Sequence, residues 1–124
     1  MAKILIVEDD AILSMLMQKN LEIMGYDVLE AVSSGSDAIQ SVVEKKPDLI
    51  IMDIAIIGSI DGIQTMIEIR KFSDIPVIYV SGNSDIKTKQ KAEATPDSQF
   101  LSKPIMSDDL KERIDSALSK TQKL

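Results

Sequence analysis

Residues 3–10 have the sequence KILIVEDD, in which four apolar residues are followed by three carboxylates. Residues 49–53 have the sequence LIIMD and repeat this pattern with a single aspartate. Two further short apolar runs end in Ser81 and Lys103. Short and nearly uninterrupted apolar runs are typical of strands that are buried on both faces of a parallel sheet. We therefore predict that these four segments are the strands of one parallel sheet.

The polar residues that end these runs indicate the chemistry of the site. In open parallel sheets, functional sites form beyond the carboxyl ends of the strands. The runs would bring the following residues to this edge: Glu8, Asp9, Asp53, Ser81 and Lys103. Clustered carboxylates bind hard cations, and Mg²⁺ typically takes one or two of them together with water and phosphate. Carboxylate, Mg²⁺, hydroxyl and lysine together are suited to phosphoryl transfer, so we expect that reaction here.

The composition limits the other possibilities. A chain of 124 residues is one domain of ordinary size, and it contains neither Cys nor His, so any histidine in the reaction must come from a partner. The net charge of −6, from 14 basic and 20 acidic residues, argues against nucleic acid as a partner. No apolar run approaches the roughly 20 residues of a membrane span, and no signal peptide is recognisable. We therefore expect a cytoplasmic protein without a membrane partner.

Strand-like runs alternate with helical patterns along the chain, which predicts an α/β three-layer sandwich. The predicted strands are 3–7, 27–32, 48–53, 75–80 and 99–102. The predicted caps of the helices include Ser34, Asp61 and Ser107, and Asp10 is interpreted as a cap and not as a ligand. The helix at 84–94 has few apolar residues, and the tail 119–124 is expected to fray. The predicted apolar faces of the other helices comprise Leu13, Met17, Leu21, Met24, Ala38, Ile39, Val42, Val43, Ile63, Met66, Ile67, Leu110, Ile114, Ala117 and Leu118.

Six short motifs resemble those of a known family. They are VEDD at 7–10, PDLIIMD at 47–53, DG at 61–62, IPVI at 75–78, SG at 81–82 and KP at 103–104. In this order and spacing the chain resembles a response-regulator receiver domain of two-component signal transduction, of the single-domain, chemotaxis-regulator-like kind. The resemblance implies a flavodoxin-like (βα)5 fold with strand order 2-1-3-4-5. It also implies one receiver domain over 1–124, ordered from about 2 to 119, with no output domain.

The resemblance assigns roles to individual residues. It implies that Asp53 is the phosphoacceptor, and that Lys103 and Ser81 bind oxygens of the phosphoryl group. It also implies that Ser81 and Phe100 act as a switch that reports phosphorylation. The implied Mg²⁺ ligands, which could also bind Mn²⁺, are Glu8, Asp9, Asp53 and the backbone carbonyl of Ala55.

The loop after Asp53 departs from the commonest pattern of the family. Nine positions separate Asp53 from Gly62, no Pro lies between them, and Gly58 resembles a feature of a known subgroup. Ala55 stands where relatives often have a polar side chain, so the resemblance leaves the lifetime of the phosphorylated state open. Ser81 replaces the commoner Thr and keeps the hydroxyl.

The implied function is that of a stand-alone response regulator. It would accept a phosphoryl group from a sensor histidine kinase or a histidine phosphotransfer protein and signal to an unknown downstream protein. It would be no enzyme beyond its own phosphorylation and slow dephosphorylation, and either a monomer or a weak phosphorylation-dependent dimer. We also expect a docking surface for the partner at the edge of the sheet where the site opens. Its predicted residues are Ile12, Met15, Gly82, Ile105 and Met106.

Three other functions compete with this interpretation. A pseudo-receiver, which binds partners without taking phosphate, is expected to lose Asp53, an acid-pair residue or Lys103, and all are present. A flavin-binding protein of the same fold needs a hydroxyl-rich phosphate loop after the first strand, where this chain has carboxylates. An aspartate-nucleophile phosphatase of the haloacid-dehalogenase kind needs a second aspartate at the position of Ala55.

Overall fold

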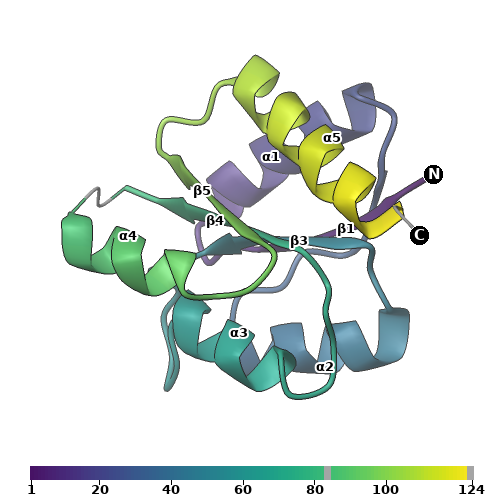
Figure 1. Cartoon of the computed structure of the whole chain (residues 1–124). Helices are drawn as coiled ribbons and strands as arrows, with labels where there is room; N and C mark the ends of the chain where they lie inside the picture. The colour runs from purple at the N-terminus through teal and green to yellow at the C-terminus, as the bar shows by residue number, and fades with distance from the viewer. Residues whose placement is uncertain (83–84, 123–124) are drawn as a thin grey trace.

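The computed structural model of the chain describes residues 1–82 and 85–122, with the side chains of 120–122 left out. Five parallel strands form one sheet in the order β2-β1-β3-β4-β5, as predicted. Figure 1 shows α1 and α5 on one face of the sheet and α2, α3 and α4 on the other. The strands are β1 (Lys3–Val7), β2 (Asp27–Val28), β3 (Leu49–Asp53), β4 (Val77–Ser81) and β5 (Ser98–Ser102). The helices are α1 (Ala11–Ile23), α2 (Gly35–Lys45), α3 (Gly62–Ile69), α4 (Ile86–Glu93) and α5 (Ser107–Gln122).

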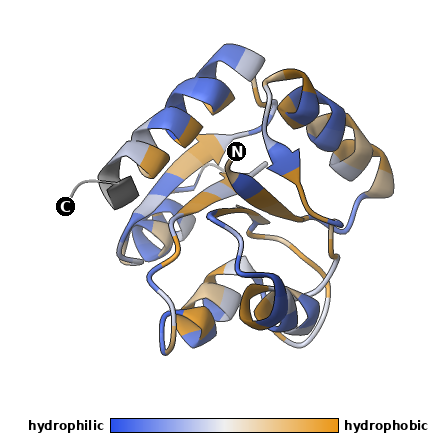
Figure 2. Ribbon diagram, turned by 90° about the vertical axis from the view of Figure 1, so that its right-hand side faces the viewer, coloured by the Kyte–Doolittle hydropathy of each residue, from blue (hydrophilic) through white to orange (hydrophobic). Residues whose placement is uncertain are grey.

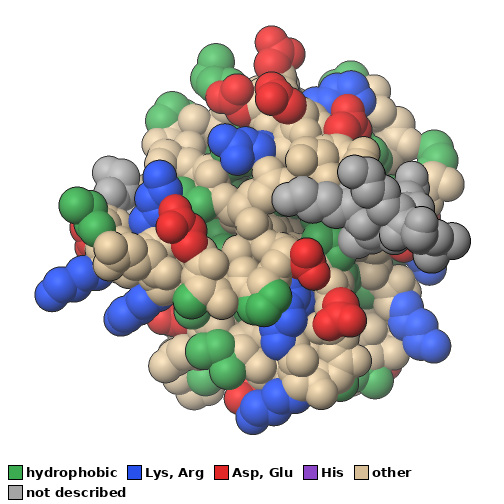
Figure 3. All heavy atoms as spheres, viewed as in Figure 1, with side chains coloured by type: hydrophobic (Ala, Val, Ile, Leu, Met, Phe, Trp, Pro, Cys, Tyr) green, Lys and Arg blue, Asp and Glu red, His purple; other side chains and the backbone are tan. Residues whose placement is uncertain are grey.

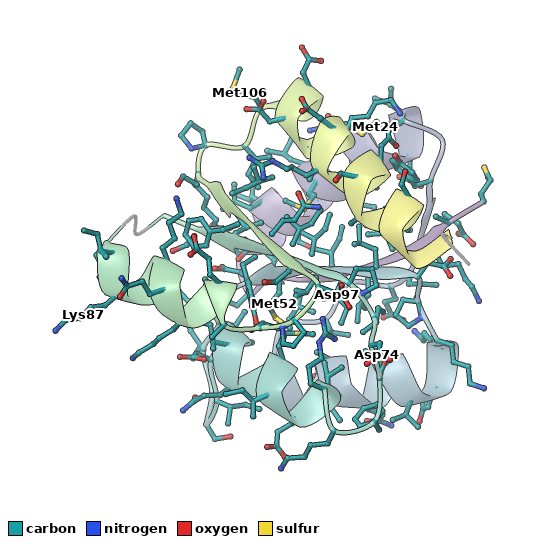
Figure 4. The ribbon with its side chains drawn as sticks, viewed as in Figure 1. Met24, Met52, Asp74, Lys87, Asp97 and Met106 are labelled. Carbon is teal, nitrogen blue, oxygen red and sulfur yellow. The ribbon has the colours of Figure 1, made fainter. Side chains whose placement is uncertain are left out.

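Successive side chains of the central strands pack into two separate hydrophobic cores, one on each face of the sheet, because side chains alternate across a strand. In β3, Ile50 and Met52 pack on the side of α2 and α3, whereas Leu49 and Ile51 pack on the side of α1 and α5. Figure 2 shows the hydrophobic colouring running through the sheet between the helices. Figure 4 shows Met52 between the sheet and the lower helices. Burial on both faces explains why these strands have continuous apolar runs in the sequence.

Two strand boundaries differ from the prediction by more than one residue. β2 was predicted over 27–32, but after Val28 only Val32 forms a further bridge, with Val7. This edge segment has a neighbour on one side only, so it can leave the regular ladder. β4 begins at Val77, later than predicted, because the amide of Ile75 is bound by the hydroxyl of Ser73 and Pro76 has no amide to donate.

Three helix residues that were predicted to be buried are largely exposed. Val43 and Ile67 are each 56% exposed, and Leu13 is 40% exposed. Val43 and Ile67 directly follow Val42 and Met66, which face the core, and a step of one residue turns about 100° around a helix. Their side chains therefore lie beside the buried face and not in it.

The helix ends confirm two of the predicted caps and correct others. The hydroxyl of Ser34 accepts from the amide of Asp37, and Asp61 forms a capping box with Gln64. Ser107 was predicted to cap α5 but lies within it, since the carbonyl of Met106 already accepts from Leu110. α5 extends to Gln122, and the fraying expected for residues 119–124 stays a prediction.

α4 buries little of its surface in the described structure. Asp85 caps it by accepting from Thr88, and the predicted start at 84 lies outside the described residues. Its buried residue is Ala92, and it exposes the lysines Lys87, Lys89 and Lys91. Figure 3 shows basic side chains projecting from this helix, and Figure 4 shows Lys87 pointing away from the body. None of the helices in the described part of the chain is long and apolar enough to cross a bilayer.

Candidate functional site

Glu8 and Asp53 lie side by side where the two central strands end. Val7 pairs with Met52 in the parallel ladder, so the residue after each reaches the same level at the carboxyl edge. Both carboxylates are buried, with 7% and 5% of their residues' surface exposed, and Asp9 is half-buried beside them. One carboxylate oxygen from each of the three residues lies within 4.8 Å of the others. No other described residues form such a group. The structure therefore places the three predicted carboxylates next to one another.

Lys103 reaches this cluster from the end of β5. Its backbone amide donates to the carbonyl of Ser81, which holds the segment after β5 against β4. Its Nζ lies 3.2 Å from Oε1 of Glu8 and 3.4 Å from Oδ2 of Asp53, so one ammonium group bridges two carboxylates. The Lys103–Pro104 peptide bond is cis.

The charges of the site do not balance. Burial, reinforced by the neighbouring carboxyl of Asp53, raises the pKa of Glu8 to about 7. Burial opposes the charge of Lys103, but the attraction of Asp53 and Glu8 outweighs it and raises the pKa of Lys103. One lysine thus faces three carboxylates. A hard cation with oxygen ligands fits this excess of negative charge.

The loop between β3 and α3 holds two of the carboxylates with backbone amides. The amide of Ala55 donates to Oδ1 of Asp53 at 3.0 Å, and the amide of Ile57 donates to Oδ2 of Asp9 at 3.1 Å. Asp10 instead caps α1 by accepting from two amides of the first turn, which agrees with its interpretation as a cap. The hydrogen bond from the Ile57 amide to Asp9 could not be predicted from the sequence. Every residue except proline has a backbone amide, so the identity of residue 57 gives no signal.

Gly62 allows α3 to begin close to the site. A side chain added at this position would lie 2.6 Å from the backbone oxygen of Asp53 and 2.9 Å from the Cα of Ile54. Its amide donates to the carbonyl of Ile54 at 2.9 Å. Glycine is therefore needed here for close approach of the two backbones.

The predicted switch residues lie on neighbouring strands. Ser81 is 2% exposed at the end of β4 and pairs in register with Ser102 of β5. Phe100 is half-buried, packs against the core on the side of α2, α3 and α4, and lies opposite Tyr79. Gly82 is exposed, with open space around its α-carbon.

One predicted docking residue, Ile105, lines a groove at the same edge, whereas Ile12 and Met15 lie on α1 and Met106 directly precedes α5. Ile12, Met15 and Met106 are 70%, 56% and 62% exposed, whereas Ile105 is half-buried against the core between α1 and α5. Figure 4 shows Met106 pointing outward at the start of α5. A groove of about 530 Å³ runs between α1 and α5. It is lined by Glu8, Leu13, Leu16, Met17, Asn20, Lys103, Pro104, Ile105, Ser107 and Leu110.

Leu13 and Leu16 line this groove, although neither was predicted from the sequence as a groove residue. A signal was available, because residues 12, 13, 15 and 16 are all apolar. One buried helical face cannot accommodate four such neighbours, so some of them must be exposed or line a groove.

Residues 4–115 match the family described as "Response regulator receiver domain". The chain belongs to this family. A "Probable transcriptional regulator ycf27" from Porphyridium aerugineum is 30% identical to this receiver domain over 121 residues, covering 98% of the chain and 50% of that protein. The "Uncharacterized transcriptional regulatory protein YrkP" of Bacillus subtilis is 34% identical over 112 residues, covering 90% of the chain and 47% of that protein. The chain thus spans about half the length of these curated relatives.

Solved structures show the same fold. The signal receiver domain of a modulated diguanylate cyclase from Desulfovibrio desulfuricans G20 superposes with a TM-score of 0.89. It is 30% identical, and the match covers 98% of this chain and 97% of that one. The family as a whole serves two-component signalling, in which an aspartate accepts a phosphoryl group. The predicted fold and family are therefore confirmed.

Proposed function

We propose that Asp53 of this receiver domain accepts a phosphoryl group from a sensor histidine kinase or a histidine phosphotransfer protein. The observation that carries the proposal is a buried carboxylate, with a lysine ammonium 3.4 Å away and two further carboxylates within 4.8 Å. The partner supplies the histidine, because this chain has none. We expect no reaction other than its own phosphorylation and slow dephosphorylation.

In the proposed step, a carboxylate oxygen of Asp53 forms a bond to phosphorus. The bond between phosphorus and the partner's imidazole nitrogen breaks, and the nitrogen keeps the electron pair. Lys103, which bridges Glu8 and Asp53, is placed to stabilise an oxygen of the transferred group, and the Ser81 hydroxyl is assigned to another. The amide of Ala55 orients the Asp53 carboxylate by donating to Oδ1.

Glu8, Asp9 and Asp53 would hold Mg²⁺, or Mn²⁺ in its place, and the backbone carbonyl of Ala55 remains a predicted ligand. Their oxygens form a compact all-carboxylate set, which suits a hard cation. The cation would supply charge neutralisation for the phosphoryl group. Burial, together with the neighbouring Asp53 carboxyl, raises the pKa of Glu8, and we expect a bound cation to lower that pKa by favouring the charged form.

We further propose that phosphorylation is reported through Ser81 and Phe100 to α4, β5 and α5, where a downstream protein would bind. Phe100 is only half-buried, and α4 has a single buried residue, so this side of the molecule has few contacts to lose. Beryllofluoride, a phosphoryl mimic, should shift the amide signals of α4 and β5 in NMR spectra. Shifts confined to the loops around Asp53 would contradict the switch.

A docking role for the rim formed by α1 and the β5–α5 loop is also proposed. Exposed Ile12, Met15 and Met106 lie on or beside α1 and α5, the two helices that border an apolar groove reaching Lys103 and Glu8. An exposed apolar patch beside a reactive group suits a partner that must present its histidine there. The expectations that the domain acts alone, and as a monomer or a weak dimer, stay predictions.

The experiment that tests the main proposal uses two aspartates at opposite ends of β3. After treatment with acetyl phosphate and Mg²⁺, intact mass measurement should show one added phosphoryl group on the wild type and on Asp48→Asn, but none on Asp53→Asn. Asp48 is the matched control because it lies just before β3 while Asp53 ends it. A wild type that gains no mass would favour the pseudo-receiver. Labelling of Asp53→Asn would disprove the assigned acceptor.

A further inference from the structure

The loop between β3 and α3 contacts the acidic pair through one backbone group. The amide of Ile57 donates to Oδ2 of Asp9 at 3.1 Å and joins residues that are 48 positions apart in the sequence. The side chain of Ile57 is 77% exposed, so it adds little packing. What Ile57 contributes to the site is therefore its N–H group.

The conformation of the β3–α3 loop orients the Ile57 amide toward Asp9. Ile54 and Ile56 are 7% and 5% exposed and anchor the loop in the core. The amide of Gly62 binds the carbonyl of Ile54 and closes the far end of the loop. Gly58 has a φ of +138°, a conformation that side chains disfavour, and it turns the chain directly after Ile57. The longer loop with its glycine thus presents residue 57 to the carboxylate.

The three carboxylates differ in how they are held. Glu8 accepts from Lys103 and from the amide of Asp10, and Asp53 accepts from Lys103 and from the amide of Ala55. For the half-buried Asp9, the amide of Ile57 is the one hydrogen-bond donor among the described residues. Without this bond, the Asp9 side chain could turn toward solvent and leave the cluster.

We propose that the backbone amide of Ile57 is a positioning group for the cation site, which holds the Asp9 carboxylate in the orientation that binds the metal. This inference rests on the proposed Mg²⁺ site of the receiver domain and adds a residue outside the acidic cluster. Because binding and orientation are linked, Mg²⁺ should in turn hold the loop more firmly on Asp9. The side chain at position 57 is free to vary, because only the amide takes part.

The test removes the N–H and leaves the side chain in place. Semisynthesis would replace Ile57 by its α-hydroxy acid analogue, so that an ester oxygen stands where the amide was. We expect Mg²⁺ affinity, measured by calorimetry, to fall about three- to tenfold, the range that corresponds to the net contribution of one typical protein hydrogen bond. Ile57→Ala, which keeps the amide, should bind Mg²⁺ like the wild type. An ester at Ser59 is the matched backbone control, because its amide has no hydrogen bond to any described residue.

The outcomes separate this inference from the proposed function. A wild type that does not bind Mg²⁺ would overturn both. Wild-type affinity in the Ile57 ester, or an equal loss in the Ser59 ester, would overturn the positioning role alone. If the ester protein does not fold, hydrogen exchange on the wild type still decides. The Ile57 amide should be protected in spite of its exposed side chain, and more so with Mg²⁺, whereas exchange at the rate of a free amide would disprove the bond.

Discussion

The two ends of β3 each carry an aspartate, and the two residues have different surroundings. Asp48, before the first residue of the strand, is exposed and accepts from the backbone amide of Lys3 at 2.7 Å. Asp53, at the last residue, is 5% exposed and lies beside two further carboxylates and a lysine. The hollow at the amino edge is also the larger one, at about 690 Å³ against about 530 Å³ for the groove between α1 and α5. The candidate site is therefore distinguished from the amino edge by its cluster of buried charged groups, and not by the volume of the neighbouring hollow.

The difference follows from the parallel arrangement of the strands. At the carboxyl edge, the ends of β1, β3, β4 and β5 lie close together. Each strand has a polar residue at its last position or directly after it. At the amino edge, the polar groups of Lys3 and Asp48 bind each other's segments and hold the strands together. Charge at one edge thus contributes to packing, whereas charge at the other remains available for a ligand.

The largest effect is expected when Lys103 at the carboxyl edge of the sheet is replaced, in comparison with Lys3 at the amino edge. Lys103→Met should slow phosphorylation by acetyl phosphate about 100- to 1,000-fold, because a positive group aimed at the transferred oxygens is lost. Lys3→Met should leave the rate unchanged, since the one hydrogen bond of its Nζ to a described residue is to the carbonyl of Lys45 at 3.5 Å. Phosphorylation is followed by intact mass against time. Mg²⁺ affinity of Lys103→Met should stay equal or increase, and a loss of Mg²⁺ binding would instead indicate a collapsed site.

The next effect concerns the protonation of Glu8. Its pKa rises from 4.5 to about 7 on folding, so the folded protein retains a proton that the unfolded chain releases. The stability from this group is fully present below pH 4.5 and is lost as the pH rises through 7. In metal-free buffer, the wild type should therefore lose up to about 3 kcal/mol of unfolding free energy across this window relative to Glu8→Gln. Urea unfolding at several pH values measures the free energy of unfolding of both proteins. If this free energy depends on pH in the same way in both, the raised pKa of Glu8 is contradicted.

The smallest expected effect compares the two ends of α1. Met15→Glu and Leu16→Glu, whose residues are 56% and 55% exposed near the site, should slow phosphotransfer from a cognate kinase about tenfold. Ile23→Glu is the matched control, because Ile23 is 84% exposed at the opposite end of the same helix. All three variants should react normally with acetyl phosphate, which needs only the metal site. An equal loss with both donors would point to a damaged fold and would contradict the docking surface.

Some features could be predicted because one local rule governs them. The apolar runs of β1 and β3 identified central strands, since such runs that end in a carboxylate are typical of strands buried on both faces of a parallel sheet. Asp61 with Gln64 identified the start of α3, because the capping box is a local contact. The exposure of Val43 and Ile67 could not be predicted this way, since it depends on the angle at which each helix lies on the sheet.

For the candidate site, the sequence by itself determined which groups were available and on which edge they would meet. The strand-like runs place Glu8, Asp53, Ser81 and Lys103 at carboxyl ends, and the strand order that brings these ends together was implied by the family resemblance. Only the tertiary structure decided how these groups are held. The bridging position of Lys103, the amide that binds Asp9 and the groove between α1 and α5 depend on distances between segments far apart in the chain. Such distances are set by the packing of whole helices and loops, which no local pattern of residues encodes.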